Sequence, residues 1–208
     1  MTALPTFDSE RALSAQGYRF IAGVDEVGRG ALAGPVFAAA VILPLESNLP
    51  WLSLVRDSKQ LSPRQRERLF KMIQRADIPM GLGAVPHTAV DEVGIVKATH
   101  LAMAKAVECL SVPPDFLLID ALTLPEISLP QKGIIHGDRL SLSIACASIV
   151  AKVSRDRHMV DLDGLYPGYG LAKHKGYGTN QHLTRLNELG PCPIHRQSFA
   201  PVQRLIQR

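Results

Sequence analysis

Four acidic side chains stand where short apolar runs of this chain end. Asp25 and Glu26 close one run and precede a glycine-rich turn, Asp120 closes a second, and Asp138 follows a third. Functional groups of α/β sheets tend to lie just beyond the ends of strands, and adjacent strands are only about 4.8 Å apart. We therefore expect carboxylates from different strands to converge at one edge of a sheet.

A cluster of carboxylates repels itself strongly unless it binds cations. Oxygen ligands without histidine or cysteine partners at a matching spacing favour Mg²⁺ or Mn²⁺ over zinc. Two such ions roughly 3.5–4 Å apart are the usual apparatus for phosphodiester hydrolysis. The four acids predict a site of this kind.

Each acid also has an ordinary structural interpretation. Asp120 is suited to start a turn, and Asp138 is suited to cap a helix that begins near Ser141. The adjacent side chains of Asp25 and Glu26 should point to opposite faces of a strand. One of them would have to reach the site from the frayed strand end or through its backbone carbonyl, and the spacing leaves this open.

The composition is that of a globular protein with an uneven charge. The chain has 208 residues, of which 46% are hydrophobic and 20% charged, which excludes disorder, collagen and coiled coil. The formal net charge is +4, but residues 152–208 alone carry nine Lys or Arg and four Asp or Glu. This basic segment fits a phosphate-rich partner, with a solvated basic face as the alternative.

The cysteines and the apolar segments predict the cellular compartment of the protein. Three cysteines without close spacing, Cys109, Cys146 and Cys192, argue against a disulfide framework and for a reducing compartment. The N-terminus has no apolar signal-peptide core. The longest uncharged stretch, residues 30–45, is too short to span a bilayer. We expect a soluble, cytoplasmic protein without a membrane segment.

Hydrophobic periodicity predicts an α/β domain with a mixed sheet and helices on its faces. The expected strands cover residues 18–25, 35–43, 80–85, 116–120 and 133–135. The expected helices cover residues 63–76 (with Ser62 as N-cap), 90–110, 141–161 and 180–188, followed by a proline-containing tail.

Five ordered blocks of the sequence resemble the ribonuclease HII family. The first is IAGVDEVGRGALAGPV at residues 21–36 and the second RDSKQL at 56–61. The third is LID at 118–120. The fourth joins Gly137-Asp138 to SIACASIVAKVSRD at 143–156, and the last is YPGYGLAKHKGYGT at 166–179. The similarity extends from about Tyr18 to Val202, and five blocks in order make it specific.

The resemblance implies a ribonuclease H-like fold, in which a mixed central sheet is flanked by helices and a small helical extension follows at the C-terminus. We expect an N-terminal extension over residues 1–17 and a catalytic domain over 18–208, whose basic helical part begins at about residue 179. Nucleic acid is the expected partner, and we expect a monomer.

The implied activity is that of an endoribonuclease. Family members hydrolyse the RNA strand of RNA–DNA hybrids and incise 5′ to single ribonucleotides in duplex DNA, leaving a 3′-hydroxyl and a 5′-phosphate. The resemblance maps the ligands of two divalent ions, Mn²⁺ or Mg²⁺, onto Asp25, Glu26, Asp120 and Asp138. Two alternatives stay open: a non-catalytic nucleic-acid-binding module, and a ribonuclease H-like nuclease of different substrate choice.

Two further motifs are suited to reading the substrate. RNA differs from DNA in its 2′-hydroxyl, and a turn of Gly28, Arg29 and Gly30 lets the backbone approach a sugar closely. By resemblance this turn contacts the 2′-hydroxyl, and Tyr177 stacks on the sugar that follows the ribonucleotide. A plain hairpin turn and a partly buried tyrosine are the alternatives.

Several polar residues are candidates for contacts with backbone phosphates, which fix the register of a duplex without reading its sequence. They are Lys59, Ser143, Ser148, Lys152, Arg155, Lys173, His174 and Lys175. The other histidines are expected in solvated or core positions. Ala31 and Ala121 depart from the Pro and Gly that are usual in the family, which puts local turn geometry in doubt.

Overall fold

The computed structural model describes residues 4–46 and 49–207, which form a five-stranded sheet of order β3-β2-β1-β4-β5. β1 is antiparallel to β2 and parallel to β4, β3 is antiparallel to β2, and β5 is parallel to β4. The predicted mixed sheet is confirmed. The strands are β1 (Ile21–Val27), β2 (Val36–Ile42), β3 (Met80–Val85), β4 (Phe116–Asp120) and β5 (Gln131–Ile134).

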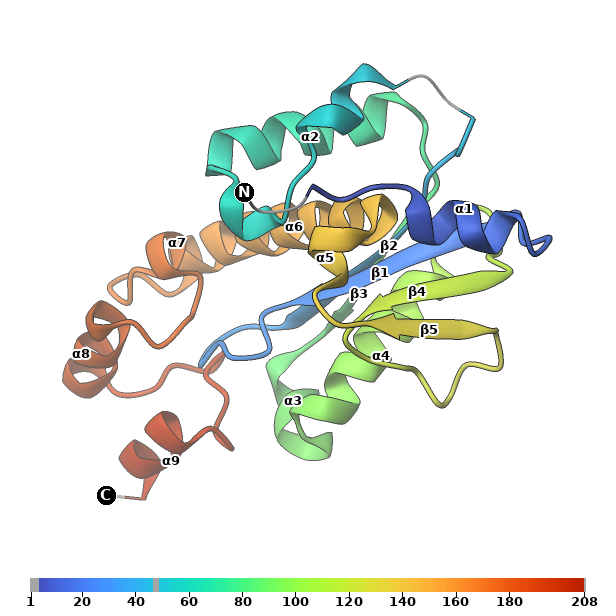
Figure 1. Cartoon of the computed structure of the whole chain (residues 1–208). Helices are drawn as coiled ribbons and strands as arrows, with labels where there is room; N and C mark the ends of the chain where they lie inside the picture. The colour runs from blue at the N-terminus through green and yellow to red at the C-terminus, as the bar shows by residue number, and fades with distance from the viewer. Residues whose placement is uncertain (1–3, 47–48, 208) are drawn as a thin grey trace.

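Helices cover both faces of the sheet (Figure 1). On one face α6 (Leu142–Leu165) packs against β1 and β2, with α2 (Pro63–Arg75) above it. On the other face α4 (Ile95–Glu108) packs against β2 and β3, next to α3 (His87–Val93). β2 is buried along its whole length, as expected for a strand that contributes side chains to two hydrophobic cores.

The start of α6 lies unusually close to β1 because Gly23 stands between them. A Cβ atom at Gly23 would lie 2.2 Å from the carbonyl carbon of Ser143 and 2.3 Å from the nitrogen of Ile144. Any other residue would therefore push the helix away from the strand. This contact matters for the site, since Asp25 follows on β1 and Asp138 precedes α6.

Some element boundaries were predicted correctly and others were not. The helix after Ser62 begins with a capping box between Ser62 and Gln65, and β3 and β4 have the predicted bounds. The single helix predicted over residues 90–110 is wrong, because Gly94 adopts φ +79° and separates α3 from α4. A further short helix, α5 (Gly137–Leu140), precedes α6.

The chain ends in a group of short helices beside one end of the sheet. These are α7 (Leu171–His174), α8 (Asn180–Leu189) and α9 (Ala200–Ile206), on the left side of Figure 1. The helix expected over residues 180–188 is not the last one, since the proline-containing segment after it includes α9, with Pro201 in its first turn, where a proline costs no hydrogen bond. Leu171, Leu186 and Val202 build a small core of their own.

The N-terminal segment is fastened to the same region as the acids. In α1 (Asp8–Ser14), the buried Glu10 accepts hydrogen bonds through Oε1 from the hydroxyls of Ser141 and Ser143 and from the Ser143 N–H, at 2.6, 2.6 and 3.0 Å. Ser141 is the N-cap of α6. The segment therefore anchors the first turn of α6.

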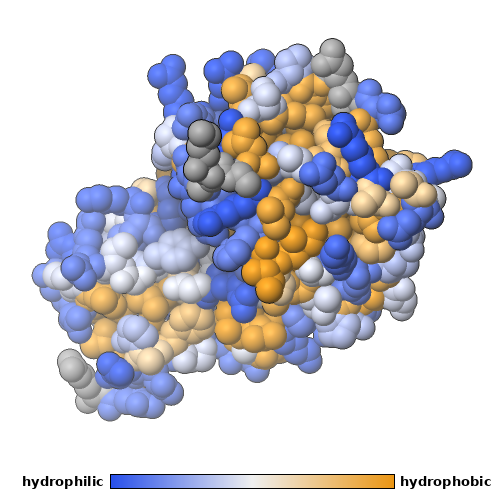
Figure 2. Space-filling model, viewed as in Figure 1, coloured by the Kyte–Doolittle hydropathy of each residue, from blue (hydrophilic) through white to orange (hydrophobic). Residues whose placement is uncertain are grey.

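Hydrophilic and hydrophobic areas alternate on the face shown in Figure 2. Hydrophobic side chains gather at its centre, over its upper part and at its lower left, with hydrophilic side chains between them. Within residues 4–46 and 49–207, no helix is long and apolar enough to cross a membrane. The three cysteines are free, as predicted from their spacing.

Candidate active site

The structure brings Asp25, Asp120 and Asp138 to one end of the sheet. β1 and β4 are paired in parallel as far as Val24 and Ile119, so Asp25 and Asp120 are the next residues of two neighbouring strands. The Gly137 N–H donates to Oδ1 of Asp120 at 2.7 Å. This bond brings Asp138, which follows on α5, to the same edge.

Glu26 lies at the same edge, although it is adjacent to Asp25 in the sequence. Residues 25–27 continue β1 beyond its last pair with β4, so this edge of the strand is open. The Glu26 N–H donates to Oδ1 of Asp25 at 2.8 Å, and Oε1 of Glu26 lies 3.4 Å from Nη1 of Arg29. Both carboxylates are close enough to Asp120 to be repelled by it.

Burial and mutual repulsion shift the protonation of these acids. Burial raises the pKa of Asp25 well above its usual range, and the charges of Glu26 and Asp120 raise it further. Burial likewise raises the pKa of Glu26, against the opposing charge of Arg29. The pKa of Asp138 is raised by burial first, and then by the neighbouring carboxylates Asp57 and Asp120. The charged forms of three carboxylates are thus disfavoured.

The donor set fits hard divalent cations. It consists of carboxylate oxygens, and a cation placed among them would remove the repulsion that raises their pKa values. Among the described residues, no three His, Cys, Asp or Glu are yet gathered closely enough to enclose a metal ion.

Asp57 is a further carboxylate at the site that the sequence analysis missed. It is buried and accepts hydrogen bonds from the Lys59 N–H at 2.9 Å and from Nε of Arg139 at 3.1 Å. These bonds outweigh the effect of burial and lower its pKa. Its position within the block RDSKQL was the available signal. Nζ of Lys59 lies 3.7 Å from Oδ2 of Asp138, which places this predicted lysine beside the acids.

The glycine-rich turn joins β1 to the loop before β2. Gly28 adopts φ +94°, and a Cβ atom there would lie 2.2 Å from Nε of Arg155, so the fold itself requires this glycine. A Cβ atom at Gly30 would meet nothing within 4 Å. Gly30 therefore presents an open backbone, while the side chain of Arg29 is 39% exposed. Ala31 donates its N–H to Gly28, a bond that proline would remove.

Tyr177 lies beside this turn. It forms an isolated β-bridge with Ala31, and its half-buried ring has Nζ of Lys152 at 5.8 Å and the guanidinium carbon of Arg155 at 5.4 Å from its centroid. The structure therefore places the two predicted substrate-reading elements next to each other. Ala121, the other family departure, adopts φ +55°, a conformation that favours glycine.

Four of the predicted phosphate contacts are not supported. Ser143 is fully buried and bonded to Glu10, and the buried Ser148 hydroxyl is bonded to Ser58 and also to Asp25, whose pKa it lowers. Arg155 is buried and donates to three backbone carbonyls, and His174 is buried against the carbonyl of Tyr169. All four side chains are buried and bonded within the protein.

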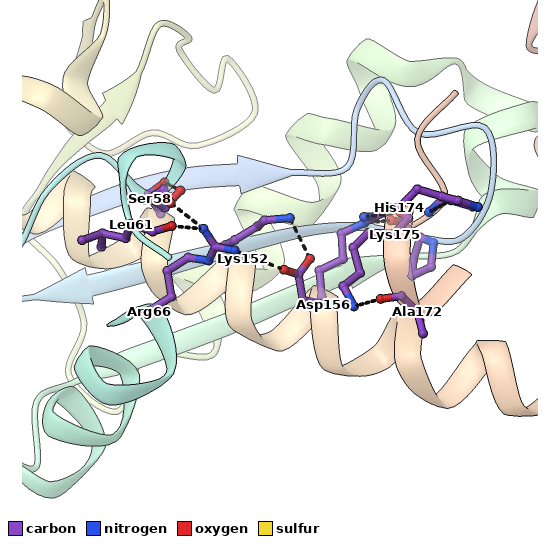
Figure 3. A network of polar contacts seen from close by, with 12 residues as sticks. Ser58, Leu61, Arg66, Lys152, Asp156, Ala172, His174 and Lys175 are labelled. Carbon is purple, nitrogen blue, oxygen red and sulfur yellow. Dashed lines mark hydrogen bonds and ion pairs between the residues drawn. The ribbon is translucent and has the colours of Figure 1, made fainter. Parts of the chain in front are cut away.

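Three other basic candidates, Lys152, Lys173 and Lys175, line a cavity of about 370 Å³ between α2, α6 and α7. Figure 3 shows Nζ of Lys152 bonded to Asp156 at 2.7 Å, and Lys175 beside it. Arg66, which the sequence analysis missed, donates to the carbonyls of Ser58 and Leu61. Lys173 and Arg157 also line this cavity, so its charge is predominantly positive.

Comparison with known proteins finds matches over nearly the whole chain. Residues 22–202 match the family model described as Ribonuclease HII. A ribonuclease HII of Dehalococcoides mccartyi (strain ATCC BAA-2266 / KCTC 15142 / 195) is 54% identical over 201 residues, which cover 97% of this chain and 95% of that protein.

Solved structures show the same architecture. The ribonuclease H2 of Pyrococcus horikoshii OT3 matches with a TM-score of 0.75 at 26% identity, and the match covers 91% of this chain and 98% of that protein's chain. The ribonuclease HII of Archaeoglobus fulgidus, solved in complex with PCNA, has a TM-score of 0.74 at 26% identity, with 90% and 97% coverage. The ribonuclease H-like fold expected from the sequence is confirmed, and the chain belongs to the ribonuclease HII family of metal-dependent endoribonucleases.

Proposed function

We propose that this chain performs the endoribonuclease reaction of its family at the carboxylate edge described above. In this proposal Asp25, Glu26, Asp120 and Asp138 hold two divalent ions, Mg²⁺ or Mn²⁺. The substrate is the RNA strand of an RNA–DNA hybrid or a single ribonucleotide embedded in duplex DNA. The proposal is supported by the meeting of β1, β4 and α5 at one edge, where burial and neighbouring charges raise the pKa values of Asp25, Glu26 and Asp138.

Divalent ions held by these carboxylates would supply an activated water for attack on the phosphate and positive charge for the departing 3′-oxygen. The chain's own residues supply position and charge. Asp120 serves as the central ligand, because its charge acts on Asp25, Glu26 and Asp138. Lys59, 3.7 Å from Asp138, offers a cation beside the acids to a phosphate oxygen.

The choice of RNA over DNA falls to the backbone of Gly28, Arg29 and Gly30. The open backbone at Gly30 leaves room for a sugar, so that its 2′-hydroxyl can hydrogen-bond to the turn. Tyr177, bridged to Ala31, lies where it can stack on the next sugar and sense a junction from RNA to DNA.

The duplex outside the cleaved position is held by the basic cavity. Lys152, Lys173 and Lys175 line it and contact backbone phosphates without reading sequence. We further propose that the chain acts as a monomer in the cytoplasm, where its free cysteines stay reduced.

Cleavage of three matched duplexes tests the proposal. One carries a single ribonucleotide in DNA, one is a continuous RNA–DNA hybrid, and one is all DNA, each incubated with Mg²⁺, with Mn²⁺ and with chelator. We expect a nick on the 5′ side of the ribonucleotide, with a 3′-hydroxyl and a 5′-phosphate, and none in all-DNA duplex.

The two competing functions give different results in the same assay. A non-catalytic binding module would bind the duplexes without nicking any of them. A ribonuclease H-like nuclease of different substrate choice would cut the hybrid and leave the single ribonucleotide intact.

A further inference from the structure

Three short segments from distant parts of the chain lie side by side behind the substrate-reading turn. The carbonyl of Leu32 accepts a hydrogen bond from the Arg196 N–H at 2.8 Å. The N–H of Leu32 donates to the carbonyl of Gly176, also at 2.8 Å. Ala33 also forms an isolated β-bridge with His195. The loop between β1 and β2 is therefore clamped between the Tyr177 segment on one side and residues 194–196 on the other.

Arg196 holds both ends of this loop. The residue is fully buried, and Nη1 donates to the carbonyl of Arg29 at 2.8 Å, while Nε and Nη2 donate to the carbonyl of Gly34 at 3.0 and 2.9 Å. Burial lowers its pKa to about 10, so the guanidinium stays charged at neutral pH. A planar group with fixed donors spans two carbonyls in one geometry, which sets the curvature of residues 29–34.

His195 reaches the other reading element through a second histidine. Nδ1 of His195 accepts the Cys192 N–H at 3.0 Å and lies 3.2 Å from the Cys192 carbonyl, which already accepts the backbone N–H of His195 at 3.0 Å. We therefore assign the proton of His195 to Nε2. That atom lies 3.1 Å from Nε2 of His182, and Nδ1 of His182 lies 3.0 Å from the carbonyl of Tyr177. With the tautomers assigned from these partners, each histidine donates to the next group, and the chain of bonds ends on the Tyr177 backbone.

We propose that His195 and Arg196 are positioning residues that couple the two substrate-reading elements. Arg196 fixes the Arg29 turn, and His195 fixes Tyr177 through His182. Because His195 and Arg196 are consecutive residues, a displacement of the Arg29 turn is transmitted to Tyr177, and the reverse. The contacts with the ribose and with the RNA–DNA junction therefore form together. This inference rests on the proposed roles of Arg29 and Tyr177.

Two variants of His182 separate positioning from simple packing. In His182→Asn the side-chain amide keeps an N–H donor near the place of Nδ1, whereas His182→Leu fills the space without a donor. We measure kcat/KM on the single ribonucleotide and on the continuous hybrid, and take their ratio as the junction preference. The ratio should fall by about tenfold in His182→Leu, which loses both bonds. It should fall by about threefold in His182→Asn, which keeps a donor for the Tyr177 carbonyl but loses the contact with Nε2 of His195.

A double-mutant cycle asks whether this effect passes through Tyr177. In a Tyr177→Ala background, His182→Leu should cause no further change in the junction preference. An undiminished further effect there, or an equal loss on both substrates in the single variant, would overturn the proposal. If Tyr177→Ala alone leaves the junction preference unchanged, the proposed role of Tyr177 is wrong, and the coupling that rests on it is wrong too. Tyr177→Ala alone thus tests the role of Tyr177, and the double variant tests the coupling.

Arg196→Lys tests the link between Arg196 and the Arg29 turn. A lysine offers donors from one nitrogen and cannot span the carbonyls of Arg29 and Gly34. We expect kcat on both ribonucleotide substrates to fall by about tenfold to a hundredfold, with KM and metal binding much less affected. Arg204→Lys on α9, where the arginine is exposed, is the matched control and should behave as wild type. Unchanged kcat in folded Arg196→Lys protein would contradict the proposal.

Discussion

The Gly137 N–H donates to Oδ1 of Asp120 at 2.7 Å, so the carboxylate that ends β4 fastens the segment that carries Asp138. The hydrogen bond and the proposed metal ligation use the same side chain. One residue therefore has a structural role and a chemical role, and substitutions can separate the two.

Replacing Asp120 by asparagine should preserve the structural role. The amide oxygen of Asp120→Asn can still accept the Gly137 N–H, and the lost charge removes repulsion from its neighbours. Asp120→Ala leaves that N–H without its acceptor, at a cost of about 1–3 kcal/mol in the free energy of unfolding. Urea unfolding without metal compares the two variants. Equal stability of both would mean that this bond does not hold the Asp138 segment.

Divalent cations should stabilise the folded chain. At a hundredfold excess of Mn²⁺ over its Kd, binding to the folded state alone adds about 2.7 kcal/mol, or roughly 5–10 °C in the thermal midpoint of a chain of this size. In Asp25→Asn the metal-induced shift should shrink. The metal-free midpoint should not drop, because burial already disfavours the charge of Asp25. A full shift in this variant would remove Asp25 from the ligand set.

Tyr177 should control substrate choice more than metal binding. Tyr177→Ala removes a ring that lies beside the glycine-rich turn, and we expect a loss of preference for a single ribonucleotide over a continuous hybrid. Tyr177→Phe keeps the stacking surface and serves as its control. Cleavage rates on the two substrates measure the preference, and the Mn²⁺-induced shift of the thermal midpoint measures metal binding. A weaker thermal shift without a change in preference would contradict this role.

The buried histidines predict a loss of stability in acid. Burial first, and then the neighbouring His182, lower the pKa of His195 to about 4 from its ordinary value of 6.5. As the pH falls, the unfolded chain takes up this proton before the folded chain does. The stability that neutral His195 contributes is therefore complete above about pH 6.5 and is lost between about pH 6.5 and 4.

Thermal midpoints over this pH range test that prediction. His195→Gln does not titrate, so its midpoint should fall less on acidification than that of the wild type. The groups that face His195 are Tyr169, His174, His182, Cys192 and, from α3, His87, and they remain unchanged in the variant. His100→Gln on α4, outside this cluster, is the control. Equal acid sensitivity of wild type and His195→Gln would exclude His195 as the linked group.

The sequence was most informative where local rules decide the structure. The start of α2 follows from Ser62 and Pro63, since an N-cap and a first-turn proline act within one helical turn. The edge that carries Asp25 and Asp120 follows from two apolar runs that end in an acid. The family blocks then assigned functions that spacing alone had left open.

The sequence was least informative about partners far away along the chain. Ser143 and Arg155 carry groups that suit phosphate, and only the fold brings Glu10 and the carbonyls of residues 33 and 35 to them. The link between His182 and His195 was missed for the same reason, because no metal-like spacing marks it. The helix expected over residues 90–110 spans Gly94, whose φ of +79° ends one helix and starts another.

Cleavage of a duplex DNA with one ribonucleotide, by wild type and by Asp120→Asn, tests the central claim most directly. With enzyme in excess and Mn²⁺ or Mg²⁺ present, we predict a wild-type nick on the 5′ side of the ribonucleotide and none with chelator. Asp120→Asn should bind the same duplex and leave it intact. Full activity of Asp120→Asn, or a wild-type nick that needs no metal, would contradict a metal-dependent site built on these carboxylates.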